Sequence, residues 1–233
     1  MTDDPTPRPS IGVHHLPVSR TARYVTLGAE AGEARQVWIA LHGYAMLAER
    51  FLRLVAPLAE DHRTLAVAPE ALSRFYLETG RDGRHSNAVG ATWLTREDRE
   101  NEIADAIRYL DQLYGELGAR LQPGATIAVL GFSQGASMAA RWVATGSLIP
   151  DHLVLWGIDP PADAIAQVAD RMAGREVTLI AGDRDPFAVE GGIEAQAAAL
   201  AQRGVRARAE RFHGGHALSK AVLRRLGEPG AHP

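Results

Sequence analysis

Residues 129–141 read "VLGFSQGASMAAR" and contain the strongest structural signal in the chain. Ser133 stands between Gly131 and Gly135, after an apolar run typical of a buried strand and before a run of small residues typical of a helix. A strand-to-helix turn of this kind exposes the serine hydroxyl and leaves no room for side chains at the two glycine positions. Serine also caps many helices. The context favours a nucleophile at Ser133 over a helix cap.

Short apolar runs alternate with helical patterns on both sides of this turn. Strands are predicted over 23–28, 36–43, 64–70, 125–132, 152–158, 177–183 and 206–214. Four of these runs lack polar residues at their centres, as strands buried on both faces do. Such alternation is typical of an α/β fold with a mostly parallel central sheet and helices on both faces. No insertion is long enough to form a large cap domain.

The clearest helical pattern begins at Thr95, which forms with Asp98 a pair typical of a capping box. Apolar residues then recur at helical spacing as far as Leu117, which predicts one face packed against the sheet. Further helices are predicted over 46–60, 134–146, 189–203 and 216–226.

The composition is that of a globular protein. The chain has 233 residues, of which 46% are hydrophobic and 23% charged. We predict a flexible lead-in over 1–10, a single domain over 11–227 and a tail over 228–233.

Composition also excludes several classes of function. The net charge of −3 provides no basic surface for nucleic acid. The absence of cysteine excludes disulfides, thiolate catalysis and cysteine-ligated zinc. No apolar run is long enough to span a bilayer, and the N-terminus lacks the pattern of a signal peptide, so we expect a cytoplasmic protein. The oligomeric state stays open between monomer and homodimer.

A serine hydroxyl needs a base that removes its proton and an acid that orients the base. Because ligands of parallel sheets bind beyond the carboxyl ends of the strands, both groups should follow strands. The C-terminal stretch "RFHGGHALSK" offers two histidines. His216 follows two glycines that let a loop bend over the site, and we prefer it as the base. His213 is the alternative.

The acid should follow the preceding strand. The stretch "VTLIAGDRDPFAV" presents Asp183 and Asp185. Asp183 abuts the strand and could instead stabilise the turn through backbone amides. Pro186 restricts Asp185 to an extended conformation, so that Asp185 projects further. We predict Asp185 as the acid, with Asp183 as the alternative; an isolated pair of acids is weak evidence for a metal.

The oxyanion that forms during acyl transfer needs amide donors. One is the backbone N–H of Gln134, directly after the nucleophile, and the other should come from the loop after an early strand. The stretch "WIALHGYAM" provides that loop, and we predict the N–H of Tyr44, with Ala45 as the next choice. His42 ends this strand, and its position favours a structural role over that of a catalytic base.

Four motifs together resemble a known superfamily. They are "LHGYA" (41–45), "GFSQGA" (131–136), "GDRDP" (182–186) and "GGH" (214–216). Their order and spacing resemble those of the α/β-hydrolases, and most closely the phospholipase/carboxylesterase family, which includes acyl-protein thioesterases and small bacterial carboxylesterases. The resemblance covers about 36–226.

The resemblance implies a catalytic triad of Ser133, Asp185 and His216, with the amides of Tyr44 and Gln134 as oxyanion hole. It also implies hydrolysis of carboxylic esters or thioesters without a cofactor. Residues 73–98 depart from the corresponding stretch of the thioesterases, which puts a thioester substrate in doubt more than the triad.

The connection 71–94 is too long for a simple turn and is a candidate wall of the substrate pocket. Aromatic and apolar residues in and around it are candidate lining residues, although each could equally belong to the core. They are Met46, Phe75, Tyr76, Trp93, Trp156 and Phe187. We expect a small-molecule ester with a short or medium acyl chain as substrate. The alternatives are a thioesterase or lysophospholipase on the same triad, and a binding protein without catalytic activity.

Overall fold

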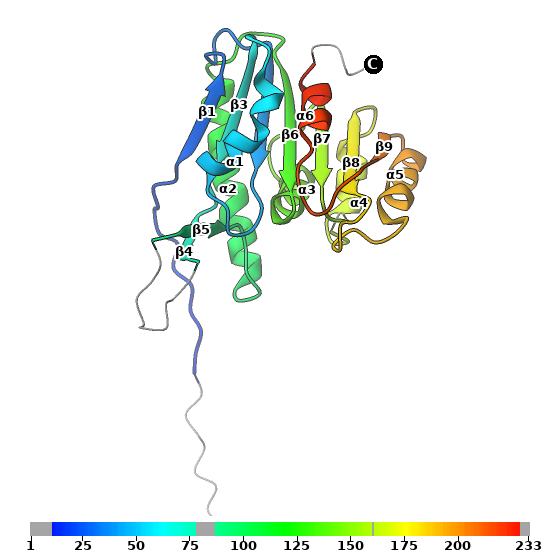
Figure 1. Cartoon of the computed structure of the whole chain (residues 1–233). Coiled ribbons are helices and arrows are strands. Elements are labelled where there is room, and N and C mark those ends of the chain that lie inside the picture. Colours follow the sequence, from blue (N-terminus) through cyan, green and yellow to red (C-terminus); the bar gives the residue numbers. More distant parts are fainter. Residues whose placement is uncertain (1–10, 78–86, 160, 229–233) are drawn as a thin grey trace, which may run out of the picture.

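A computed structural model describes residues 11–77, 87–159 and 161–228 of the chain (Figure 1). The predicted lead-in, 1–10, lies outside the described residues, as does the predicted tail except for its first residue.

Seven strands form one central sheet in the order β1-β3-β2-β6-β7-β8-β9. They are β1 (Tyr24–Gly28), β2 (Gln36–Leu41), β3 (Thr64–Pro69), β6 (Thr126–Phe132), β7 (His152–Trp156), β8 (Glu176–Gly182) and β9 (Arg206–Phe212). Only β1 pairs antiparallel, with β3, and every other pairing in this sheet is parallel. The mostly parallel sheet predicted from the sequence is therefore confirmed.

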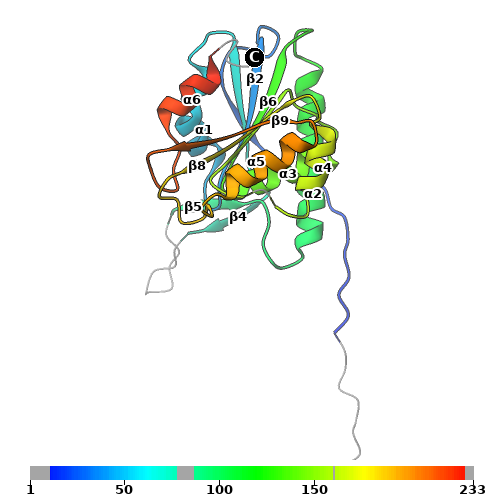
Figure 2. The same cartoon turned by 90° about the vertical axis from the view of Figure 1, so that its right-hand side faces the viewer.

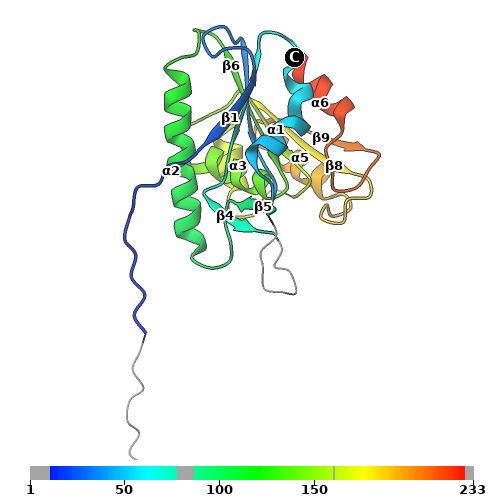
Figure 3. The ribbon, with the colours of Figure 1, turned by 60° about the vertical axis from the view of Figure 1, so that its left-hand side comes forward.

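Helices cover both faces of the sheet, and each face has its own apolar core (Figures 2 and 3). One face packs against α1 (Ala48–Val55), the short 3-10 helix Ala56–Ala59 and α6 (Lys220–Gly227). The other packs against α2 (Arg99–Gly118), α3 (Gln134–Thr145), α4 (Ile165–Arg171) and α5 (Gly192–Gln202). Within the described residues, no additional domain covers the carboxyl ends of the strands.

Several elements of the chain differ from the sequence prediction. The strands β4 (Ser73–Tyr76) and β5 (Val89–Thr92) form a separate antiparallel pair at the carboxyl edge of the main sheet, inside the predicted pocket wall (Figure 1). The predicted helix over 46–60 is divided, because Pro57 lies in the first turn of the 3-10 helix that follows α1.

The predicted start of α2 is also wrong. The helix begins at Arg99, and Asp98 precedes it in a left-handed conformation with φ of 50°. Thr95 does not pair with Asp98; its N–H and hydroxyl both donate to the Glu102 carboxylate, at 2.5 and 2.9 Å. The carboxylate of Glu102, four residues after Asp98, therefore fixes the segment that precedes the helix.

The strand order reverses direction at the carboxyl ends of β2 and β6. These strands are neighbours, but the chain leaves β2 toward β3 on one side and β6 toward β7 on the other. Loops that diverge in this way open a space above the sheet, where ligands of parallel α/β folds bind. The loops after β2 and β6 carry Tyr44 and Ser133.

Packing of α2 on the sheet gives a test of the fold. Leu110 is fully buried on α2, whereas Leu54 on α1 is 45% exposed. We expect Leu110→Ala to lower the free energy of unfolding by about 2–5 kcal/mol, because it removes buried contacts and leaves a cavity. Leu54→Ala should change it by less than about 0.5 kcal/mol. Urea unfolding of both variants measures the difference, and equal effects would contradict the burial described here.

Candidate active site

Ser133 forms the turn between β6 and α3. Its backbone has φ of 54° and ψ of −122°, which a residue other than glycine rarely adopts. Its N–H donates to the carbonyl of Trp156 at the end of β7, at 2.7 Å. Such a strained backbone persists only where the surrounding structure holds it, and it is found most often at functional sites.

The glycine at 135 lets this turn form. A Cβ on Gly135 would lie 2.2 Å from the carbonyl oxygen of Leu41, far inside van der Waals contact. A Cβ on Gly131 would come equally close to α3, at 2.4 Å from Cα of Ala136. Helix α3 therefore starts in direct backbone contact with the ends of β2 and β6, as the motif predicts.

Asp185 and His216 meet at the same edge of the sheet. Asp185 follows β8 and His216 follows β9, and His216 Nδ1 lies 2.8 Å from Asp185 Oδ2. The other oxygen of Asp185 accepts the N–H of Phe187 at 2.9 Å. The Asp185 side chain is only 1% exposed. A buried carboxylate at this position holds the Nδ1 proton and leaves Nε2 free to accept one.

The imidazole of His216 lies beside the strand ends that hold Ser133. Its ring centroid is 5.0 Å from that of Phe132, the residue before the serine, and 4.7 Å from that of Phe187. A Cβ on Gly157, directly after the Trp156 that binds Ser133, would lie 2.9 Å from His216 Cε1. Within the described chain no hydrogen bond joins Ser133 Oγ to His216 Nε2. Such bonds often close only when substrate binds.

The two alternatives from the sequence, Asp183 and His213, pair with each other. Asp183 Oδ2 accepts from His213 Nδ1 at 2.9 Å, and Asp183 Oδ1 accepts the N–H of Gly214 at 2.9 Å. The Gly214 N–H and the His213 ring together hold the pKa of Asp183 below its usual range. His213 is 80% exposed, so this pair lies on the surface.

The predicted oxyanion donors are the N–H groups of Tyr44 and Gln134. Neither has a hydrogen-bond acceptor within the described residues. The loop with Tyr44 is close to Ser133, since a Cβ on Gly43 would lie 3.4 Å from Ser133 Cβ. The N–H of Ala45, the second choice from the sequence, donates to the carbonyl of Ala91 at 2.9 Å. Ala45 is therefore occupied, and Tyr44 stays the candidate.

The Gln134 side chain has a role that the sequence did not reveal. Its Oε1 accepts the N–H of Trp93 at 3.0 Å, and its Nε2 donates to the carbonyl of Leu94 at 2.8 Å. It also exchanges a hydrogen bond with the hydroxyl of Thr92. The residue after Ser133 thus fixes the end of β5 against α3.

His42 has the structural surroundings expected from its place at the end of β2. It is fully buried, its Nδ1 lies 2.7 Å from the carbonyl of Gly43, and its Nε2 accepts the N–H of Ala71 at 3.1 Å. Burial lowers the pKa of His42, which keeps the ring neutral. With both nitrogens occupied, it has no free atom with which to act as a base.

Two of the predicted pocket residues lie in the core. Trp156 is fully buried, with its indole N–H donated to the carbonyl of Ala217 at 3.0 Å. Trp93 is 3% exposed and donates to the carbonyl of His42 at 2.8 Å. Neither therefore lines an open substrate pocket at the triad. Each lies at or directly after the end of a short strand that other segments cover. The sequence around a single aromatic residue does not reveal such burial.

The other predicted pocket residues stay accessible at the carboxyl edge. Phe187 is 64% exposed beside His216, and Tyr76 is 56% exposed on β4. Phe75 packs on Tyr44 with ring centroids 5.4 Å apart. Met46 is half-buried next to Gly43, with its sulfur 3.5 Å from where a Gly43 Cβ would lie. Residues 78–86 of the predicted pocket wall lie outside the described residues.

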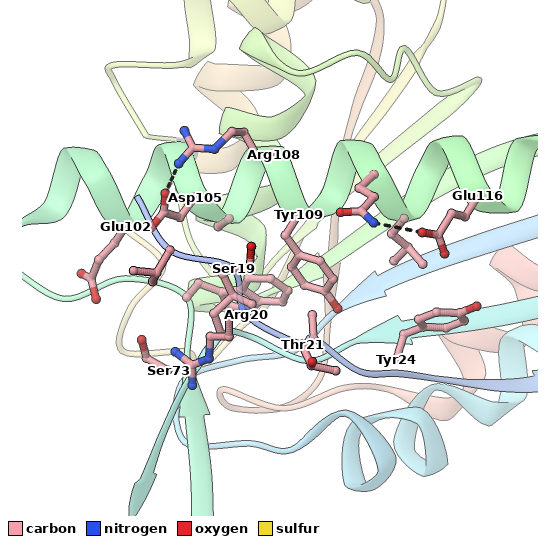
Figure 4. A pocket seen from close by; sticks show the side chains of 17 residues that line it. Ser19, Arg20, Thr21, Tyr24, Ser73, Glu102, Asp105, Arg108, Tyr109 and Glu116 are labelled. Carbon is pink, nitrogen blue, oxygen red and sulfur yellow. Dashed lines mark hydrogen bonds and ion pairs between the residues drawn. The ribbon is translucent and has the colours of Figure 1, made fainter. Parts of the chain in front are cut away.

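A hollow of about 660 Å³ lies elsewhere, between residues 18–24 and α2 (Figure 4). Tyr109 and Arg20 line it, and Asp105 and Arg108 form an ion pair on its rim. None of the triad candidates lines this hollow. It is a separate feature of the α2 face.

Metal-binding clusters and membrane spans are both absent from the part of the chain that the structure describes. No group of three or more histidine, aspartate or glutamate side chains is arranged there to hold a metal ion. No described helix has the length and apolar character needed to cross a membrane.

No model of a known protein family matches the chain, and no curated protein matches it either. Solved structures do match. The structure of esterase PE8 is 24% identical in sequence, with a TM-score of 0.63, and the match covers 89% of this chain and 97% of that one. The Bacillus cereus carboxylesterase is 18% identical, with a TM-score of 0.65 and coverages of 88% and 92%. Acyl-protein thioesterase 2 of Zea mays is 16% identical, with a TM-score of 0.64 and coverages of 88% and 98%. The chain therefore has the α/β-hydrolase fold of these proteins.

The contact between Gly157 and His216 gives a test of the site. Gly157→Ala would place a methyl group against the imidazole, and we expect the reaction of Ser133 with a fluorophosphonate probe to slow by about 10²-fold. Gly174→Ala is the matched control, because Gly174 has a similar φ of 73° but no atom within 4 Å of its Cβ position. Mass spectrometry of the labelled protein measures the rate. Equal rates in the two variants would show that His216 does not act on Ser133.

Proposed function

We propose that the chain is a serine hydrolase that cleaves carboxylic esters with short or medium acyl chains. Ser133 is the nucleophile, His216 the base and Asp185 the acid. The observation that carries the proposal is the 2.8 Å contact between His216 and the buried Asp185, beside the strained turn at Ser133. A buried carboxylate, an imidazole and a strained serine at one sheet edge form the arrangement that activates a hydroxyl.

The first half of the reaction acylates the enzyme. His216 Nε2 takes the proton of the Ser133 hydroxyl while Oγ attacks the acyl carbonyl. The N–H groups of Tyr44 and Gln134 donate to the oxyanion, and Asp185 stabilises the imidazolium. The C–O bond to the leaving alcohol then breaks, and His216 gives that alcohol its proton.

The second half releases the acid. His216 removes a proton from water, whose oxygen attacks the acyl carbon, and the same two amides hold the second oxyanion. The bond to Ser133 Oγ breaks and the serine regains its proton from His216. Water and ester enter and carboxylic acid and alcohol leave, so the cycle balances without a cofactor.

Two observations support an ester as the substrate. The proteins whose structures match are an esterase, a carboxylesterase and an acyl-protein thioesterase. The accessible residues Phe187 and Tyr44, on loops, and Tyr76, on β4, lie at the carboxyl edge of the sheet, where they can contact a short apolar chain. The match to the Zea mays acyl-protein thioesterase favours a second candidate, thioester hydrolysis on the same triad, because the acyl-enzyme is common to both reactions.

A panel of substrates tests this proposal. We expect hydrolysis of p-nitrophenyl esters, fastest for short and medium acyl chains, and slower turnover of acyl-CoA and of a lysophospholipid. Ser133→Ala should lower kcat by about 10⁶-fold, which brings it to background. Labelling of wild-type protein by a fluorophosphonate separates an enzyme with an untested substrate from a binding protein. A wild-type protein that turns over none of these substrates and is not labelled would contradict the proposal.

The choice of acid has its own test. Asp185→Asn should lower kcat by about 10⁴-fold, because the amide no longer stabilises the imidazolium or the required tautomer. Asp183→Asn should have a much smaller effect, since Asp183 faces His213. Steady-state kinetics on one ester measures both. The reverse order of effects would make Asp183 the acid of the triad.

A further inference from the structure

We propose that Asp183 is a positioning residue that holds His216 in place without touching it. Its carboxylate joins the acid loop, residues 183–188, to the histidine loop, residues 213–217. The inference rests on the proposed function, because its consequence is the rate at which His216 acts. It gives a role to a side-chain pair that lies outside the triad.

Three side chains form the joint. Asp183 Oδ1 accepts the N–H of Gly214 and Asp183 Oδ2 accepts from His213 Nδ1, both at 2.9 Å. Arg184 completes the cluster, because its guanidinium lies 3.2 Å from His213 Nε2 and 3.7 Å from Asp183. Both oxygens of Asp183 therefore bind the histidine loop, and neither is directed to His216.

Backbone hydrogen bonds show that this joint lies where the pairing of the two loops ends. The N–H of Asp183 donates to the carbonyl of Phe212, and the N–H of Arg184 donates to the carbonyl of Gly214, each at 2.9 Å. Beyond these bonds the pairing of the two segments ends. Past Arg184 and Gly214, the described residues of the two loops share one more hydrogen bond, from His216 to Asp185. Asp183 thus fixes the last paired position before the triad contact.

The sequence of the histidine loop makes such a joint necessary. Two glycines, Gly214 and Gly215, precede His216, and glycine leaves the backbone more freedom than any other residue. At its far end the loop is held by Trp156, whose indole N–H donates to the carbonyl of Ala217. At its near end the carboxylate of Asp183 removes the freedom of Gly214. A shift of about 1 Å in the imidazole would slow catalysis by about 10²-fold.

Exposure argues against a role in global stability. The Asp183 side chain is 43% exposed and that of His213 is 80% exposed. Ion pairs and hydrogen bonds at such positions add little to the free energy of unfolding. The joint therefore acts on local geometry, which separates its effect on catalysis from any effect on folding.

The experiment compares Asp183→Ala with Asp183→Asn. Alanine removes both acceptors, and we expect kcat for a small ester to fall by about 10- to 100-fold while KM stays within about twofold. Asparagine keeps an oxygen for the Gly214 N–H and should recover most of the loss. Asp170→Ala is the matched control, because Asp170 is an exposed aspartate that pairs with Arg203 at the C-terminal ends of α4 and α5. All three should melt within a few degrees of wild type.

The rate of Ser133 labelling in the two variants distinguishes position from charge. Asp185 is the charged group in contact with His216, with Phe132 and Phe187 as its other neighbours. A looser contact leaves the imidazole less often in the reactive position, so the rate at which a fluorophosphonate labels Ser133 should fall together with kcat in Asp183→Ala. Asp183→Asn also lacks the charge but keeps the joint, and its labelling rate should stay near that of wild type.

Each contrary outcome has a separate meaning. Wild-type kcat in folded Asp183→Ala would overturn the inference and leave the proposed function intact. Equal losses of kcat and of labelling rate in the two variants would show that the charge acts, and not the joint. Unfolding of Asp183→Ala would make Asp183 a determinant of stability, against the positioning role. An inactive wild-type protein that no fluorophosphonate labels would refute the proposed function itself.

Discussion

The arrangement of the site depends on how closely α3 approaches the end of β2. Gly135 brings the helix backbone into contact with the carbonyl of Leu41, where no side chain fits. This contact forces the sharp turn at Ser133, whose N–H is then held by Trp156 on the neighbouring strand. It also brings the loop after β2 beside Ser133. A single close approach therefore places the Ser133 hydroxyl near the loop that carries the N–H of Tyr44.

The remaining parts converge because parallel strands end at one edge. Asp185 follows β8 and His216 follows β9, which pair in register, so their loops leave the sheet side by side. The buried carboxylate of Asp185 has a hydrogen-bond donor for each oxygen, from Phe187 and His216. This satisfies the carboxylate in a place where an unpaired charge would be unstable. The same network orients the imidazole.

Much of the fold could be predicted because strands buried on both faces leave a plain apolar pattern. All seven strands of the main sheet were predicted, whereas the pair β4 and β5 was missed because its four-residue strands carry almost no periodicity. The choice between Asp183 and Asp185 stayed open because it depends on the direction of a turn. Trp156 was wrongly placed in the pocket. It is buried at the carboxyl end of β7, and the sequence of one strand does not show which segments cover that end.

The central claim is that Ser133, His216 and Asp185 act together at one edge of the sheet. A crystal structure of the protein after reaction with a fluorophosphonate tests it most directly. The account predicts phosphorus bonded to Ser133 Oγ and a phosphoryl oxygen about 2.7–3.1 Å from the N–H groups of Tyr44 and Gln134. His216 should remain bonded to Asp185, with Nε2 directed at the adduct. An adduct on another residue, or an imidazole turned away from Ser133, would contradict the account.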